Sequence, residues 1–134
     1  MDQTATPPNG KKVLIIEDEQ FISDLYVRAL TRAGYEVKLV IDGQQALEAA
    51  QTNLYDIILL DIMLPNLTGT EILRRLRDLK QTPQLKAKVI ITTNLELDEQ
   101  GRADMESHAD GYIVKAEVTP KELVAFLDQL QLNS

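Results

Sequence analysis

The sequence predicts an α/β domain in which helices cover both faces of a doubly wound, five-stranded parallel sheet. Five short apolar runs, rich in β-branched residues, recur along the chain, and segments with helical spacing of apolar residues lie between them. Strands that alternate with helices form parallel sheets with right-handed crossovers. The runs also differ in polarity, which indicates which strands lie at the centre of the sheet.

The predicted strands occupy residues 13–16, 37–41, 57–60, 89–91 and 112–114. The first and third runs are uniformly apolar, which is typical of strands buried on both faces. Residues 35–42 alternate between apolar and polar side chains, as expected for a half-covered edge strand. These polarities argue the order in part and match 2-1-3-4-5, a (βα)5 flavodoxin-like arrangement. Its ligand site lies beyond the carboxyl ends of the strands, between strands 1 and 3.

Helical spacing predicts the segments between the strands, and capping signals mark where they begin. Asp42 with Gln45, Thr68 with Glu71 and Thr119 with Glu122 are spaced as capping boxes, and Pro120 suits a first helical turn. The fourth helix, about residues 98–108, is mostly polar and is expected to be the loosest. The apolar faces are predicted to hold Phe21, Ile22, Leu25, Ala29 and Leu30; Ile72, Leu73, Leu76 and Leu79; Ala103, Met105 and Ala109; and Leu123, Phe126, Leu127 and Leu130.

The 134 residues suit one domain over residues 11–131, with a disordered extension at 1–10 and a short tail at 132–134. The net charge of −7 argues against direct binding of nucleic acid or of anionic membranes. No apolar segment approaches the roughly 20 residues that span a bilayer, and the polar start MDQTATPPNGKK lacks the apolar core of a signal peptide. We therefore expect a soluble protein that is not exported. The absence of cysteine rules out a disulfide framework and a thiol nucleophile and fits a reducing compartment, so we expect the cytoplasm.

Polar residues follow the predicted strands where the ligand site is expected. Glu17 and Asp18 follow the first strand, Asp61 the third, Thr93 ends the fourth and Lys115 follows the fifth. One ammonium cannot balance three converging carboxylates, whereas a divalent cation can. An all-oxygen donor set without His or Cys suits Mg²⁺.

Asp61 could act as a nucleophile toward a phosphoryl group if a metal and a nearby ammonium offset the charge of the incoming oxygens. Each residue also has a structural interpretation. Asp61 could cap a helix or turn, Thr93 could be an ordinary strand residue, and Lys115 could be a solvated charge. That all of them fall at matching strand ends favours one shared site.

The motifs VLIIEDE, IILLDIMLPNLTG, VIITT and DGYIVK, in this order, resemble the receiver domain of two-component response regulators, in particular single-domain chemotaxis-like regulators. The resemblance covers residues 11–131. It implies that Asp61 is the phosphoacceptor, that Asp18 binds Mg²⁺ directly, and that Glu17 does so directly or through water. It further implies roles for the Met63 carbonyl as a metal ligand, for Thr93 and Lys115 as partners of the phosphoryl group, and for Tyr112 as a rotamer switch.

By this resemblance the chain is a phosphorylation-dependent signalling switch rather than an enzyme, although it assists its own phosphorylation and slow dephosphorylation. Its expected partners are a histidine kinase or phosphotransfer protein and a downstream protein target. The output surface would comprise the fourth helix, fifth strand and fifth helix. The protein would be a monomer or a phosphorylation-dependent dimer.

Four positions depart from the family pattern. Ala116 follows Lys115 where the family usually has a cis proline, which predicts a trans Lys115–Ala116 bond. Asn94 replaces a small residue and is expected to slow the entry of small phosphodonors. Met63 and Leu95 are apolar where the family orients the attacking water, which predicts slow self-dephosphorylation.

Other functions remain open at this point. The chain could be a non-cycling, receiver-like interaction module, or the receiver part of a larger transcription factor or hybrid kinase. A phosphatase of the haloacid-dehalogenase type would need a second aspartate at the position of Met63. A flavin carrier would need a polar phosphate loop where Glu17, Asp18 and Glu19 stand, and a nucleotide hydrolase would need a GxxxxGK[ST] loop.

Overall fold

A computed structural model describes residues 9–64, 66–82, 84–94 and 99–130 of the protein. The strands are β1 (Lys12–Ile16), β2 (Glu36–Val40), β3 (Ile57–Asp61), β4 (Lys88–Thr93) and β5 (Gly111–Val114). The helices are α1 (Gln20–Arg32), α2 (Gly43–Gln51), α3 (Gly69–Arg77), α4 (Glu99–His108) and α5 (Pro120–Asp128), with a 3₁₀ turn at Lys115–Glu117.

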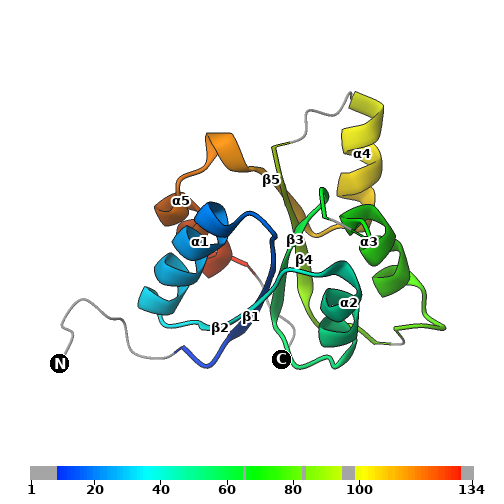
Figure 1. Ribbon diagram of the computed structural model, residues 1–134, viewed down its shortest axis with the longest axis horizontal. Coiled ribbons are helices and arrows are strands. Elements are labelled where there is room, and N and C mark those ends of the chain that lie inside the picture. The colour runs from blue at the N-terminus through cyan, green and yellow to red at the C-terminus, as the bar shows by residue number, and fades with distance from the viewer. Residues whose placement is uncertain (1–8, 65, 83, 95–98, 131–134) are drawn as a thin grey trace.

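The strands form one parallel sheet in the order β2-β1-β3-β4-β5, which confirms the predicted fold. Helices α1 and α5 cover one face, and α2, α3 and α4 lie on the other (Figure 1). Each face has its own apolar core, with Leu14 and Ile58 on the α2–α3 side and Val13 and Ile57 on the α1–α5 side. Successive side chains of each strand point to opposite faces of the sheet and so contribute to both cores.

The burial of each strand follows from its place in the sheet. All five side chains of the central strand β3 are buried, whereas β2, at the edge, alternates between exposed and partly buried side chains up to Val40. The polarity of the runs thus correctly placed β2 at an edge and β1 and β3 inside the sheet. The predicted extension of the second strand to Ile41 is wrong, because the strand ends at Val40 and Ile41 is exposed.

Three predicted positions on the helix faces are wrong. Phe21 is exposed, because the buried face of α1 is centred on Ser23, Tyr26 and Leu30. Leu79 is exposed because α3 already ends at Arg77.

Ala103 is also exposed, whereas Met105 and Ala109 are partly buried against the core as predicted. Phe126 is only partly covered and lies over Gly111 of the edge strand β5.

The predicted helix starts are confirmed, and only one has the complete capping box. Thr119 accepts a hydrogen bond from the Glu122 backbone N–H, and the Glu122 carboxylate accepts one from the Thr119 N–H. At the other two starts only the first of these bonds is found: the Asp42 side chain accepts from the Gln45 N–H, and the Thr68 side chain accepts from the Glu71 N–H. At the start of α3 the Glu71 carboxylate instead accepts hydrogen bonds from Arg74 and Arg75.

Gly69, the first residue of α3, lies directly against the end of β3. A Cβ at this position would be 2.1 Å from the Asp61 carbonyl oxygen and 2.6 Å from the Ile62 Cα. The Gly69 N–H also donates to the Ile62 carbonyl at 3.0 Å. Only glycine allows this approach, so the backbone that carries Asp61 is held in place by the start of α3.

We expect Gly69→Ala to destabilise the fold by roughly 1–3 kcal/mol, because the added methyl group forces two backbone segments apart. Helix propensity alone predicts the opposite sign, since alanine is favoured over glycine by about 1 kcal/mol in a helix interior and in the same direction, by less, at the first position. Urea unfolding measures the change, with the exposed neighbour Thr70→Ala as the control. A Gly69→Ala chain as stable as the native one would contradict this account of the contact.

Some sequence predictions lie outside the described residues, including most of the extension at 1–10 and the tail at 132–134. Asn9, the first described residue, donates its backbone N–H to the Gly34 carbonyl at 3.0 Å. Within the described part of the chain, no helix combines the length and the apolar character needed to cross a membrane.

Candidate functional site

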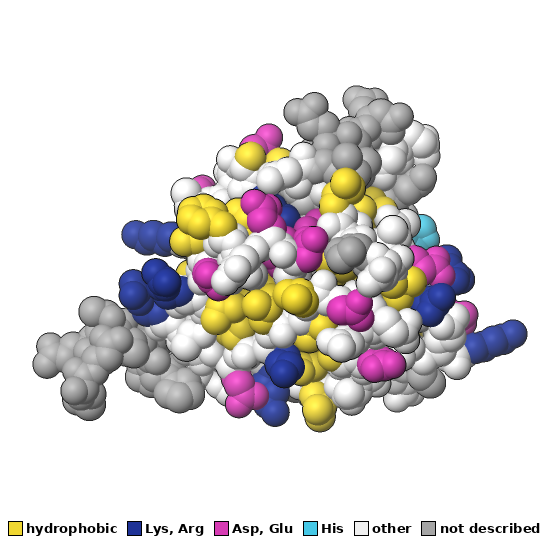
Figure 2. All heavy atoms as spheres, viewed as in Figure 1, with side chains coloured by type: hydrophobic (Ala, Val, Ile, Leu, Met, Phe, Trp, Pro, Cys, Tyr) yellow, Lys and Arg dark blue, Asp and Glu magenta, His cyan; other side chains and the backbone are white. Residues whose placement is uncertain are grey.

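Acidic side chains gather on the face seen in Figure 2, over the carboxyl ends of the central strands and beside hydrophobic side chains. A cavity of about 360 Å³ lies at this edge of the sheet. Its lining consists of Asp18, Glu19, Asp61, Met63, Asn94 and Lys115. A larger hollow of about 750 Å³ between α1 and β2 has Asp24 as its only carboxylate among the described residues, so the strand-end cavity is the better candidate for charge-based chemistry.

Asp61 is the last residue of β3 and is 3% exposed. Its Oδ2 atom accepts a hydrogen bond from Lys115 Nζ at 3.0 Å. Its Oδ1 atom accepts one from the Met63 backbone N–H at 3.0 Å. A buried carboxylate is stable only when its charge is paired and its oxygens are bonded, and both conditions are met here.

Glu17 follows β1 directly and is also buried. Its Oε1 atom contacts Lys115 Nζ, and its Oε2 atom accepts a hydrogen bond from the Glu19 backbone N–H at 3.1 Å. Burial is the main cause that raises the pKa of Glu17, and the charge of Asp61 adds to it. The hydrogen bonds from Lys115 and Glu19 act in the opposite direction.

Lys115 bridges the two buried carboxylates from the first position of the 3₁₀ turn after β5. Burial by itself lowers the pKa of Lys115, but its bonds to Glu17 and Asp61 outweigh burial, so the pKa is raised and the ammonium stays charged. The Lys115–Ala116 peptide bond is trans, as predicted. The solvated strand-end charge considered for Lys115 is excluded by its burial.

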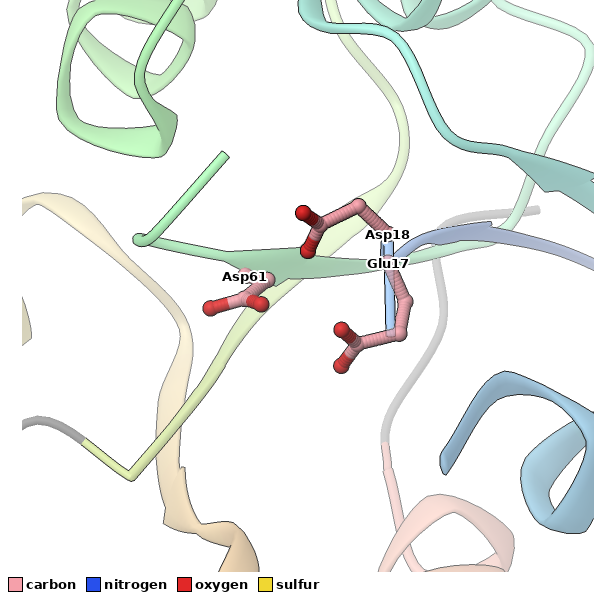
Figure 3. A group of neighbouring side chains, drawn as sticks. All are labelled: Glu17, Asp18 and Asp61. Carbon is pink, nitrogen blue, oxygen red and sulfur yellow. The ribbon is translucent and has the colours of Figure 1, made fainter. Parts of the chain in front are cut away.

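The carboxylates of Glu17, Asp18 and Asp61 each offer an oxygen, and these oxygens all lie within 4.8 Å of one another. Figure 3 shows the three side chains at the ends of β1 and β3, with the Asp18 carboxylate turned to the Asp61 side. With Lys115 they leave a net charge of about −2, which a divalent cation would neutralise. The all-oxygen donor set, with Asp18 exposed to solvent, fits Mg²⁺, which retains several waters.

Of the remaining predicted residues, Thr93 and Met63 lie at the cavity edge of the sheet, whereas Tyr112 lies within β5. Thr93 is fully buried at the end of β4, one residue before Asn94, which lines the cavity. Tyr112 on β5 is partly buried against the core on the α2–α3 side. Met63 lines the cavity and is 60% exposed. Leu95 lies outside the described residues.

Sequence reasoning missed three features of this site. Nothing in the local pattern indicated that Glu17 would pair with Lys115, or that the Met63 N–H would bond Asp61. It also overlooked Tyr26 of α1, which is buried close enough to the site for the charges of Lys115, Glu17 and Asp61 to act on its hydroxyl. Burial is the main cause that raises the pKa of Tyr26.

A comparison with known families identifies the family to which the chain belongs. The family model of the response regulator receiver domain matches residues 13–128. The chain belongs to this family. As a receiver domain it is part of a class of signalling modules of two-component systems, and the class is not one of conventional enzymes.

Curated relatives include response regulators from staphylococci. The chain is 41% identical over 104 residues to the response regulator ArlR of Staphylococcus saprophyticus. The aligned region covers 78% of this chain and 45% of ArlR. It is 40% identical over 116 residues to the transcriptional regulatory protein SrrA of Staphylococcus aureus, covering 86% of this chain and 45% of SrrA. The chain thus spans about half the length of these relatives.

Solved receiver structures have the same fold. The chemotaxis protein CheY4 of Vibrio cholerae is 29% identical with a TM-score of 0.74, covering 90% of this chain and 98% of CheY4. The receiver domain of the sensor histidine kinase PA1611 from Pseudomonas aeruginosa is 28% identical with a TM-score of 0.76, covering 90% of this chain and 96% of that domain. The PA1611 structure has a magnesium ion coordinated in its active-site cleft.

Proposed function

We propose that this receiver domain accepts a phosphoryl group on Asp61 from the phosphohistidine of a histidine kinase or phosphotransfer protein. A carboxylate oxygen of Asp61 forms a bond to phosphorus while the bond from phosphorus to the imidazole nitrogen breaks, and the imidazole leaves with that electron pair. The observation that carries the proposal is the placement of Asp61, buried at a strand end, 3.0 Å from Lys115 Nζ and beside two further carboxylates.

The chain's own residues would prepare this transfer. The residues that would hold Mg²⁺ are Glu17, Asp18, Asp61 and the Met63 carbonyl; when bound, the ion offsets the negative charge of the phosphoryl oxygens. Lys115 would pair with one of these oxygens, since its ammonium already contacts Asp61. The hydroxyl of Thr93, at the end of β4, would bond another.

The output surface would be the α4–β5–α5 face. The support for this is the position of β5, which stands last in the sheet order and so forms an edge of the described sheet, with α4 on one side and α5 on the other (Figure 1). A phosphoryl group that draws Thr93 inward would change the space available to Tyr112 on the neighbouring strand. A downstream protein that binds this face would then read the phosphorylated state.

The test is intact-mass analysis of the native chain after incubation with Mg²⁺ and a small phosphodonor such as a phosphoramidate. We expect the mass of one added phosphoryl group, with peptide mapping placing it on Asp61 and with little uptake when Mg²⁺ is chelated. No uptake from the small donor or from a phosphohistidine protein would instead support the non-cycling interaction module.

We expect the phosphorylated chain to lose its phosphoryl group over minutes or longer. Hydrolysis needs a positioned water, and Met63, which lines the cavity, offers only a thioether side chain, too weak an acceptor to hold one. Repeated mass spectra after removal of the donor give the half-life, and Met63→Gln, similar in length but able to bond water, is expected to shorten it. A half-life of seconds in the native chain would show that Met63 is no obstacle.

A further inference from the structure

A hydrogen bond joins Asn94, which lines the cavity, to Ala116, which follows the cavity residue Lys115. Asn94 follows β4, and Ala116 lies in the 3₁₀ turn after β5. The Ala116 backbone N–H donates a hydrogen bond to Asn94 Oδ1 at 2.8 Å. The pairing of β4 with β5 ends at Thr93 and Val114, so this side chain continues the link between the strands just beyond their last paired residues.

This contact acts on the peptide group that follows Lys115. The bonded N–H belongs to the peptide group between Lys115 and Ala116. The orientation of this peptide group fixes the backbone at Lys115 and so the direction in which the Lys115 side chain starts. That side chain is long and flexible, yet its ammonium must reach Glu17 and Asp61 at a buried point. A displacement of the Lys115 backbone would therefore displace Nζ relative to Asp61.

We propose that Asn94 is a positioning residue that holds the Lys115 backbone through the Ala116 amide and thereby aligns the ammonium on Asp61. This inference rests on the proposed function, in which Asp61 accepts the phosphoryl group. In this role Asn94 promotes phosphorylation, whereas a side chain that only hinders the entry of the phosphodonor would slow it. Loss of an obstacle speeds phosphorylation, whereas loss of a positioning contact slows it.

Two substitutions separate these roles. Asn94→Leu keeps the size of the side chain and removes the acceptor, and Asn94→Ala removes both. We expect both variants to lower the maximal rate of phosphorylation at saturating phosphodonor roughly 3–10-fold, the range that corresponds to one hydrogen bond. The donor concentration at half-maximal rate should stay close to the native value in Asn94→Leu. A native maximal rate in Asn94→Leu, or a faster one in Asn94→Ala, would overturn the positioning role.

A matched control is available at the other end of the strands. Asn9 Oδ1 also accepts a hydrogen bond from a backbone amide, that of Lys11, at 2.9 Å. Asn9→Leu makes the same chemical change before β1, far along the strand from the site. We expect its phosphorylation rate to match that of the native chain, and a loss equal to that of Asn94→Leu would count against a specific effect on Lys115.

Hydrogen exchange and NMR provide readouts that do not depend on phosphorylation. The Ala116 amide should exchange slowly in the native chain and in Asn94→Asp, which keeps an acceptor oxygen, and faster in Asn94→Leu. The NMR signal of the Lys115 ammonium should move in Asn94→Leu and stay unchanged in Asn9→Leu. If the native chain takes up no phosphoryl group, the proposed function fails, and the ammonium signal still decides this inference. A moved signal supports it and an unmoved one overturns it.

Discussion

Asp61→Asn is expected to abolish the uptake of a phosphoryl group. Asparagine has nearly the same shape, and its Oδ1 atom can still accept the hydrogen bond from Met63 N–H. Its amide nitrogen carries no nucleophilic lone pair comparable to that of a carboxylate, and it would place N–H donors against the Lys115 ammonium. Intact-mass analysis under the conditions that modify the native chain measures the effect.

The control for this prediction is Asp24→Asn, which changes an exposed aspartate of α1 outside the strand-end cavity. This variant should take up phosphoryl groups at the native rate. Asp61→Asn should also bind Mg²⁺ more weakly, because one of three clustered carboxylates has lost its charge. Continued uptake by Asp61→Asn would show that another residue is the acceptor.

The fold could be predicted largely from the sequence, because the central strands are buried on both faces and the edge strand is not. A strand buried on both faces has a continuous apolar sequence, and an edge strand has an alternating one, so the sequence itself indicates the position of the strand. Helix faces were less certain. On α1 the pattern favoured Phe21, whereas the buried face is centred on Ser23, whose hydroxyl satisfies its polarity locally by donating to the Gln20 carbonyl at 3.0 Å. Because a serine counts as polar in the sequence pattern, the prediction left Ser23 out of the buried face and placed Phe21 in it.

The residues of the candidate site were proposed from the strand ends and from the family resemblance, as was the approach of Lys115 to Asp61, but two of its other contacts were not. Glu17 and Lys115 are 98 positions apart, and their pairing depends on how the ends of β1 and β5 approach across the sheet. The bond from Met63 N–H to Asp61 depends on one turn of backbone. Such contacts arise from tertiary packing, which apolar periodicity does not encode.

Lys115→Met is expected to destabilise the fold by about 3–5 kcal/mol at neutral pH in the absence of Mg²⁺. Methionine fills a similar volume and removes the only ammonium that contacts Glu17 and Asp61 among the described residues. Two buried carboxylates would then face each other without a counter-charge. Urea unfolding in the presence of a chelator measures the loss, and Lys121→Met, an exposed position on α5, serves as the control.

The cause of this loss can be separated from a packing defect by restoring the charge balance in two ways. Added Mg²⁺ should recover part of the stability of Lys115→Met, because the carboxylates that lost their ammonium can share the ion. Glu17→Gln in the same chain should also recover part of it by removing one of the two facing charges. If neither change helps, or if Lys121→Met is equally destabilised, the ammonium of Lys115 is not what holds these carboxylates in the fold.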